Sequence, residues 1–192
     1  LGIGFNIGAL WHPMKDMGVG VVYRRGPRFD TSETLNIGGA STSVDFGFKV
    51  PDVAAAGISY RFFERLTVGF EATYIQYSQL VKNFQVLLGQ TNPRKYKVDD
   101  ALELHLGAEY IFFLKDIPFA ARAGAYTNPD HKIRYIKKPS NIDEVGERLL
   151  YSGGHDRVNA TAGLGVVPFP GFQLDFAGNY SKDQRSDRKS VV

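Results

Sequence analysis

The stretch Asp100–Tyr110, DALELHLGAEY, decides the fold of this chain because its apolar and polar side chains alternate almost without error. Successive side chains of a β-strand point to opposite faces of a sheet, so Leu104 and Leu106 share one face. Carboxylates are almost never buried without partners, so the face that carries Glu103 and Glu109 must be wet. The same alternation recurs along the chain. This pattern predicts an all-β, antiparallel transmembrane β-barrel.

The composition excludes several classes of protein. The chain has 192 residues, no Cys and a formal net charge of +3. A mean hydropathy of -0.21 and the lack of a long uncharged apolar run exclude a transmembrane helix. Lys and Arg are not gathered in one block, so we expect no nucleic acid partner. We expect neither a cofactor nor a metal ion, because His12, His105, His131 and His155 have no ligand spacing.

About eight strands can be delimited from the alternation and the turn residues between them. They are Gly2–Trp11, Gly18–Arg28, Phe46–Phe62, Leu66–Gln79, Asp100–Leu114, Ile117–Tyr126, Asp156–Val167 and Phe172–Tyr180. Pro51, near the start of the third strand, predicts an edge, a bulge or a kink there.

Short and long connections take turns between these strands. The short ones are His12–Asp16, Phe63–Arg65, Lys115–Asp116 and Pro168–Gly171, and the long ones include Phe29–Val44, Leu80–Val98 and Thr127–Gly154. Bacterial outer-membrane barrels have tight periplasmic turns and long extracellular loops, with aromatic residues at both membrane interfaces. A soluble sandwich or lipocalin-like barrel also alternates, but it buries its apolar face inside. The loop lengths favour the membrane barrel.

Both ends of the chain look like cuts in a longer protein. The N-terminus opens directly as a strand with no basic leader region, and the C-terminus stops where a polar loop turns into a further strand. We interpret residues 1–192 as a partial outer-membrane β-barrel domain.

Several motifs follow one another in an order that is typical of a known family. Gly4–Leu10 followed by Val19–Arg24 forms the first hairpin of this pattern. The others are Val50–Asp52, Gly57–Arg61, Leu66–Phe70, Tyr74–Gln79, Asp100–Ala101, Gly107–Tyr110, Arg122–Tyr126 and His155–Arg157. Together they resemble the FadL-type transporters of long-chain fatty acids and toluene (OmpP1/FadL/TodX). Tyr77 stands where that family commonly has a tryptophan.

The resemblance implies a barrel of about fourteen strands, monomeric when full length, that an N-terminal hatch plugs. Residues 1–192 would form about the second, C-terminal half of that barrel, and the hatch and the closing strand would lie outside them. It further implies passive uptake of hydrophobic compounds, such as long-chain fatty acids or aromatic hydrocarbons, across the bacterial outer membrane. The expected partners are these small molecules and outer-membrane lipids.

Nine inward positions carry a charge or a histidine. They are Arg24, Arg61, Glu71, Glu103, His105, Glu109, Arg122, Arg157 and Asp175. We interpret them as a charge ladder that pairs across strands and holds the lumen in shape. The alternative is that some basic members attract a carboxylate, as Arg and Lys do.

A second candidate site precedes the fifth strand. The resemblance places a substrate-facing basic residue near the cluster Arg94, Lys95 and Lys97. Phe84, Leu87 and Leu88 could supply an apolar partner, since an apolar patch among polar loops often marks a binding surface. The alternatives are a solvated loop tip for the cluster and a continuation of the fourth strand for the apolar run.

Two other functions remain open at this point. A structural or adhesive barrel would bind a ligand with its extracellular loops and transport nothing. An outer-membrane lipase needs a nucleophile with a positioned base, and nothing in the sequence links His105 to Ser59 or Ser78. We therefore expect no enzyme activity.

Overall fold

The computed structural model describes residues 2–37, 40–82 and 93–184. Eight strands form one antiparallel sheet: β1 (Phe5–Met14), β2 (Met17–Arg25), β5 (Val53–Phe62), β6 (Leu66–Ile75), β8 (Ala101–Leu114), β9 (Ile117–Asn128), β11 (Asp156–Phe169) and β12 (Phe172–Gln184). Each strand pairs with the next in that order, so β1 and β12 form the two edges of the sheet. The predicted all-β, antiparallel architecture is confirmed.

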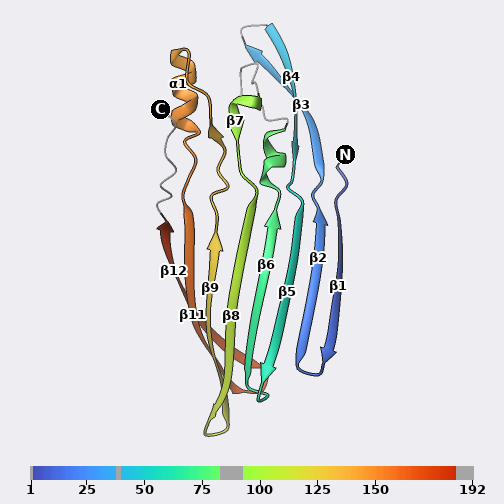
Figure 1. Cartoon of the computed structure of the whole chain (residues 1–192), viewed down its shortest axis with the longest axis vertical. Coiled ribbons are helices and arrows are strands. Elements are labelled where there is room, and N and C mark those ends of the chain that lie inside the picture. The colour runs from blue at the N-terminus through green and yellow to red at the C-terminus, as the bar shows by residue number, and fades with distance from the viewer. Residues whose placement is uncertain (1, 38–39, 83–92, 185–192) are drawn as a thin grey trace.

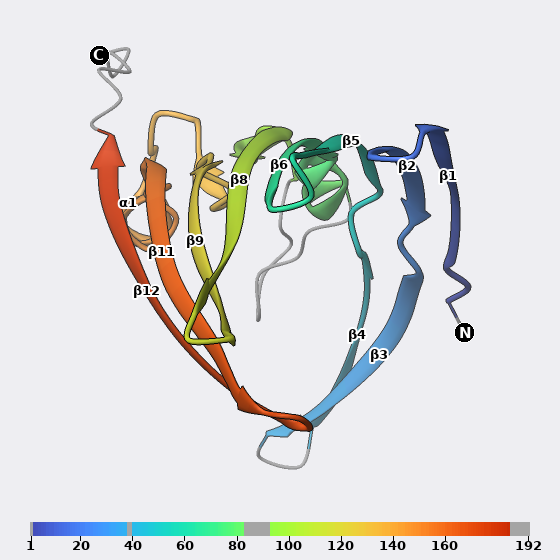
Figure 2. The same cartoon turned by 90° about the horizontal axis from the view of Figure 1, so that it is seen from below.

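The sheet is a curved trough with different connections at its two ends. Figure 1 shows the four tight turns at one end of the strands and the long connections at the other. Figure 2, along the strands, shows the sheet as an open arc, with the 3-10 helix η1 (Tyr77–Val81) on its inner side. The alternation of short and long connections therefore sorts them to opposite ends, as the sequence predicts.

Two tight turns place ordinary side chains in the left-handed backbone region. Phe63 and Glu64 have φ angles of 52° and 61°, and Lys115 and Asp116 have φ angles of 50° and 65°. Two consecutive central residues with positive φ make a type I′ turn, whose twist matches that of the strands it joins. A two-residue turn of this kind therefore closes the hairpin β8–β9. In β5–β6 the same turn is followed by Arg65, whose N–H donates to the carbonyl oxygen of Phe62 at 3.1 Å, so three residues separate the last pair of the two strands.

The connection after β2 is a hairpin, so the prediction of a loop over Phe29–Val44 is wrong. β3 (Arg28–Ile37) and β4 (Ala40–Lys49) form a separate antiparallel pair that extends beyond β2 and β5 (Figure 1). The sequence of this pair does alternate, because single polar or small residues separate Val44, Phe46 and Phe48 of β4, and Phe48 is in register with Phe29 of β3. The assignment of a loop overlooked this period of two, which Thr31 and Glu33 interrupt in β3.

The predicted strand Phe46–Phe62 is two strands, β4 and β5, which residues 50–52 separate. Pro51 has no N–H to donate to a sheet, which explains a break at this position. The fourth strand ends at Ile75 rather than Gln79. A hydrogen bond from the Gln76 N–H to the carbonyl oxygen of Asp52 at 2.9 Å extends the pairing with the β5 side by one position. The chain then turns into η1.

The longest polar stretch, Thr127–Gly154, contains regular structure that the sequence analysis missed. β10 (Arg134–Tyr135) pairs with β7 (Tyr96–Lys97), which follows the short helix η2 (Pro93–Lys95), and α1 spans Ile142–Leu150. The Asn141 side chain accepts a hydrogen bond from the Glu144 N–H at 2.9 Å and so caps α1. Among the described residues, no helix is both long and apolar enough to cross a membrane.

The buried hydrophobic residues lie at the end of the trough that carries the long connections. We call η1, η2, β7, β10 and α1 the cap. Tyr96, Val98, Ala101 and Tyr135 are the buried hydrophobic residues among those described. Along the strands the large apolar side chains stay exposed, with Leu106 at 54% and Phe176 at 67%. An exposed apolar face of this extent is typical of a sheet that lies against lipid or another protein.

Candidate functional site

The strand registers place all nine residues of the predicted charge ladder on one face of the sheet, which we call the ladder face. One row of pairs runs Arg61, Thr67, Glu109 and Arg122 across β5, β6, β8 and β9. The ladder positions that share this face are Arg24, Arg61, Glu71, Glu103, His105, Glu109, Arg122, Arg157 and Asp175. The large apolar side chains of the same strands, such as Leu106, lie on the opposite face.

The ladder face lines the inner side of the trough. Ala101 and Asn159 belong to this face and are only 1% and 3% exposed, although they lie on an otherwise open sheet. They lie at the end of the sheet where the cap is, and Figure 2 shows η1 inside the arc. The cap therefore covers the ladder face at its mouth, while the apolar face stays outside.

Three charged side chains from three strands form the central ionic contact. Arg122 on β9 donates from Nε to Glu109 Oε2 on β8 at 2.6 Å. Its Nη1 donates to Asp175 Oδ1 on β12. These side chains keep between 37% and 45% of their surface exposed, so the contact is solvated and contributes modestly to stability.

The contact between Arg122 and Asp175 crosses an intervening strand. β11 lies between β9 and β12, and Gly165 of β11 pairs with Asp175. A Cβ atom at position 165 would lie 2.6 Å from Asp175 Oδ1 and 3.1 Å from Arg122 Nη1. Glycine is therefore the residue that leaves the guanidinium a path across the strand.

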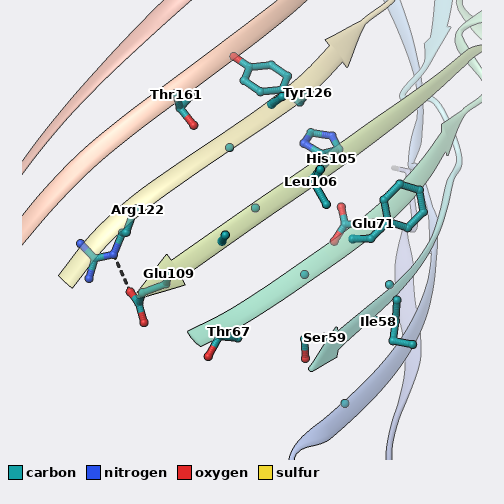
Figure 3. Close-up of a pocket in the computed structure, with 18 of the residues that line it drawn as sticks. Ile58, Ser59, Thr67, Glu71, His105, Leu106, Glu109, Arg122, Tyr126 and Thr161 are labelled. Atoms are coloured by element: carbon teal, nitrogen blue, oxygen red, sulfur yellow. Dashed lines mark hydrogen bonds and ion pairs between the residues drawn. The ribbon is translucent and has the colours of Figure 1, made fainter. Parts of the chain in front are cut away.

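A row of glycines forms the floor of a hollow beside this contact. Gly69, Gly107 and Gly124 are paired in register across β6, β8 and β9. The hollow has a volume of about 880 Å³, within the usual range of ligand pockets. Figure 3 shows Glu109 and Arg122 joined on one side of it, with Glu71, His105 and Tyr126 nearby.

The next row of the ladder face, on the side of the glycines toward the cap, carries larger polar and aromatic side chains. Glu71 pairs with His105, and His105 pairs with Tyr126. The rings of His105 and Tyr126 stack at 5.4 Å with an interplanar angle of 6°. Next to Tyr126 in register is Asn159, whose Nδ2 has no hydrogen-bond partner among the described residues.

The remaining ladder residues differ in their contacts. Arg157 donates to Asp183 at 2.9 Å, and His105 lies 3.6 Å from Glu103. Arg24 and Arg61 have no ion pair with any residue that the structure describes. The ladder is thus a set of separate contacts rather than one continuous chain of ion pairs.

Two of the three residues of the predicted basic cluster, Lys95 and Lys97, form ion pairs. Lys95 Nζ lies 2.5 Å from Glu144 Oε1 on α1, and Lys97 Nζ lies 2.8 Å from Asp99 Oδ1. The hydrogen bond from Lys95, together with those from Ser140, lowers the pKa of Glu144 from 4.5 to about 2. Arg94 is exposed. The apolar candidates Phe84, Leu87 and Leu88 lie outside the described residues.

Asp52 is a buried anchor that the sequence analysis did not identify. Its carboxylate accepts hydrogen bonds from the Gly26 N–H at 2.9 Å, Lys49 Nζ at 2.7 Å and Gln79 Nε2 at 2.9 Å. Burial alone would raise the pKa of Asp52, but the bonds from Lys49, Gln79 and Gly26 lower it from 3.8 to about 2. Asp52 thereby joins the base of the β3–β4 hairpin to the start of η1. An acidic residue after Pro51 was the only sequence signal available.

The comparisons with known proteins agree with this architecture. The family model described as outer membrane protein transport protein (OMPP1/FadL/TodX) matches residues 1–190. The chain belongs to this family. A search of curated proteins finds no significant match.

Two solved structures share the fold. The CymD monoaromatic hydrocarbon channel is 18% identical with a TM-score of 0.58, and it matches 95% of this chain and 47% of its own length. A Pseudomonas aeruginosa FadL homologue is 18% identical with a TM-score of 0.59, and it matches 93% of this chain and 43% of its own length. The chain therefore spans less than half the length of either protein.

Proposed function

We propose that the whole protein, in the bacterial outer membrane, takes up hydrophobic compounds passively through the bore that the ladder face lines. Long-chain fatty acids and aromatic hydrocarbons are the two candidate substrate classes. In a membrane, β1 and β12 must pair with further strands, because lipid cannot satisfy their edge N–H and C=O groups. Residues 1–192 then form one part of a monomeric barrel domain.

The observation that carries this proposal is the division of the sheet into two faces. Apolar side chains such as Leu106 point outward and are exposed, while the charged ladder and the hollow of about 880 Å³ lie inside. An apolar solute that enters the hollow leaves water, which stabilises binding by about 25 cal/mol per Å² of apolar surface buried. No energy source is required for a downhill flux.

Uptake by intact cells tests the proposal. Cells that produce the full-length protein should accumulate labelled toluene or oleate faster than cells with an empty vector. A structural or adhesive barrel, in contrast, gives the rate of the empty vector for both. The triple variant Arg94→Gln, Lys95→Gln, Lys97→Gln tests whether the basic cluster takes part in uptake. If the cluster binds the carboxylate of oleate, the variant lowers the uptake rate of oleate; if it has no such role, the rate stays at that of the wild type.

A further inference from the structure

The hollow has an unusual charge balance for a site that is open to carboxylates. Its charged lining residues are Glu71, Glu109, Arg122 and Asp175. Arg122 is the one cation among them, and Glu109 and Asp175 both accept hydrogen bonds from it. The lining thus carries an excess of negative charge, and its guanidinium is already engaged by two carboxylates.

The other cations of the ladder face lie outside the lining of the hollow. Arg24 and Arg61 have no ion pair with a described residue, but neither lines the hollow, and Arg157 is paired with Asp183. Above the hollow, Lys95 and Lys97 are paired with Glu144 and Asp99. Each of these pairs lowers the attraction that its cation can offer to a passing anion.

We infer that this wall of the bore selects uncharged hydrophobic molecules over analogues that carry a carboxylate. The inference rests on the proposed function and decides between its two substrate classes in favour of neutral hydrocarbons. A carboxylate in the hollow meets the like charges of Glu71, Glu109 and Asp175, and it can reach Arg122 only by displacing one of its present partners. A neutral molecule can lie against the row of Gly69, Gly107 and Gly124 without this repulsion and without displacing a partner of Arg122.

A pair of ligands that differ in one terminal group tests this directly. Labelled n-butylbenzene and 4-phenylbutyrate share the aromatic ring and the alkyl chain, and only the second is an anion at pH 7. With the full-length wild type in intact cells, we expect the uptake rate of butylbenzene above the empty vector to exceed that of phenylbutyrate by about tenfold or more. An equal or higher rate for phenylbutyrate overturns the inference but leaves the proposed function in place. No uptake of either ligand overturns the proposed function itself.

Freeing Arg122 should change the selectivity. The double variant Glu109→Gln, Asp175→Asn removes two negative charges and leaves the guanidinium available, so the ratio of phenylbutyrate uptake to butylbenzene uptake should rise several-fold. The matched control is Asp183→Asn, which frees Arg157 outside the hollow and should leave the ratio unchanged. The role of the hollow is contradicted if the double variant leaves the ratio of the two uptake rates unchanged. It is also contradicted if Asp183→Asn changes that ratio equally.

A pH series on the wild type does not depend on the folding of a variant. At pH 4, where much more of the phenylbutyrate is protonated and neutral, its uptake should approach that of butylbenzene. If phenylbutyrate uptake instead falls as the ligand loses its charge, the bore recognises the carboxylate and the inference is wrong.

Discussion

Arg122 on β9 and Asp175 on β12 are joined by a hydrogen bond that passes over Gly165 of the intervening strand. Most ion pairs in sheets connect adjacent strands, where cross-strand side chains meet directly. Here Gly165 has no side chain, so the guanidinium of Arg122 can cross β11 and contact Asp175 on β12. Because Arg122 also donates to Glu109 on β8, it links the three strands β8, β9 and β12.

The coupling between Arg122 and Asp175 should depend on Gly165. In the full-length protein, a double-mutant cycle with Arg122→Gln and Asp175→Asn should give a coupling free energy of up to about 1 kcal/mol, because both side chains are partly exposed. In a Gly165→Ala background the coupling should fall to near zero. Urea unfolding measures both cycles. Gly107→Ala is the matched control, since no atom lies within 4 Å of a Cβ at that position. A coupling that survives Gly165→Ala contradicts the proposed path.

Replacing the buried carboxylate of Asp52 should loosen the base of the β3–β4 hairpin. Asp52→Asn weakens the charge-assisted bonds from Lys49 and Gln79, and each such bond is worth about 1.5–3 kcal/mol. We expect faster proteolysis between β2 and β5, with the rest of the barrel intact. Asp30→Asn, which removes an exposed pair with Arg28 in the same hairpin, should have little effect. Equal protease sensitivity of the two variants would show that Asp52 anchors nothing.

Acid should weaken the cap over a defined pH range. The pKa of Glu144 in the folded chain, about 2, lies below its ordinary value of 4.5, so the folded state favours the ionised form. Its contribution to stability is complete above pH 4.5 and is lost as the pH falls toward 2. Calorimetry of the full-length protein should show the thermal midpoint falling in this range. Glu144→Gln should flatten that part of the profile, and an unchanged profile argues against the link between Lys95 and Glu144.

A charge placed on the apolar face should be costly, whereas a charge on the ladder face should be tolerated. Leu106→Arg on β8 should destabilise the membrane-inserted barrel by about 2–4 kcal/mol if this position lies near the bilayer midplane. His105→Arg, its neighbour on the ladder face, should cost much less because it meets water. Folding titrations into vesicles compare the two variants. Similar costs for both would mean that lipid does not cover the apolar face.

The sequence predicted the strands that cross the membrane better than the structure beyond them. In Asp100–Tyr110 one face must be apolar and the other wet, so the period of two is regular and marks β8 clearly. In β3 the polar residues Thr31 and Glu33 stand at positions of the apolar set, so the alternation is weaker there and the stretch was interpreted as a loop. The α1 helix did leave a signal, because Asn141 followed by Glu144 is typical of a helix N-terminus, but a helix in a long polar stretch was not considered.

The ladder could be predicted as a face but not as a set of contacts. The alternation within each strand determines which of its residues share a face. The strand registers then place these residues of β2 to β12 on the same ladder face. The bond between Arg122 and Asp175 depends on a diagonal reach and on the absence of a side chain at position 165. The pairing of Lys95 with Glu144 joins residues 49 positions apart in the cap. Neither follows from the pattern of a single strand.

The most direct test of which face of the sheet meets water is cysteine labelling along β8 of the full-length protein. Residues 1–192 contain no cysteine, and any cysteine elsewhere in the full-length protein is first replaced by serine. Single substitutions at positions 102–109 are exposed, in intact cells, to a water-soluble maleimide that does not cross membranes. We expect labelling at Glu103→Cys, His105→Cys, Gly107→Cys and Glu109→Cys, and little labelling at the other four positions, 102, 104, 106 and 108. Labelling that is uniform, or strongest at Leu104→Cys and Leu106→Cys, would contradict this expectation.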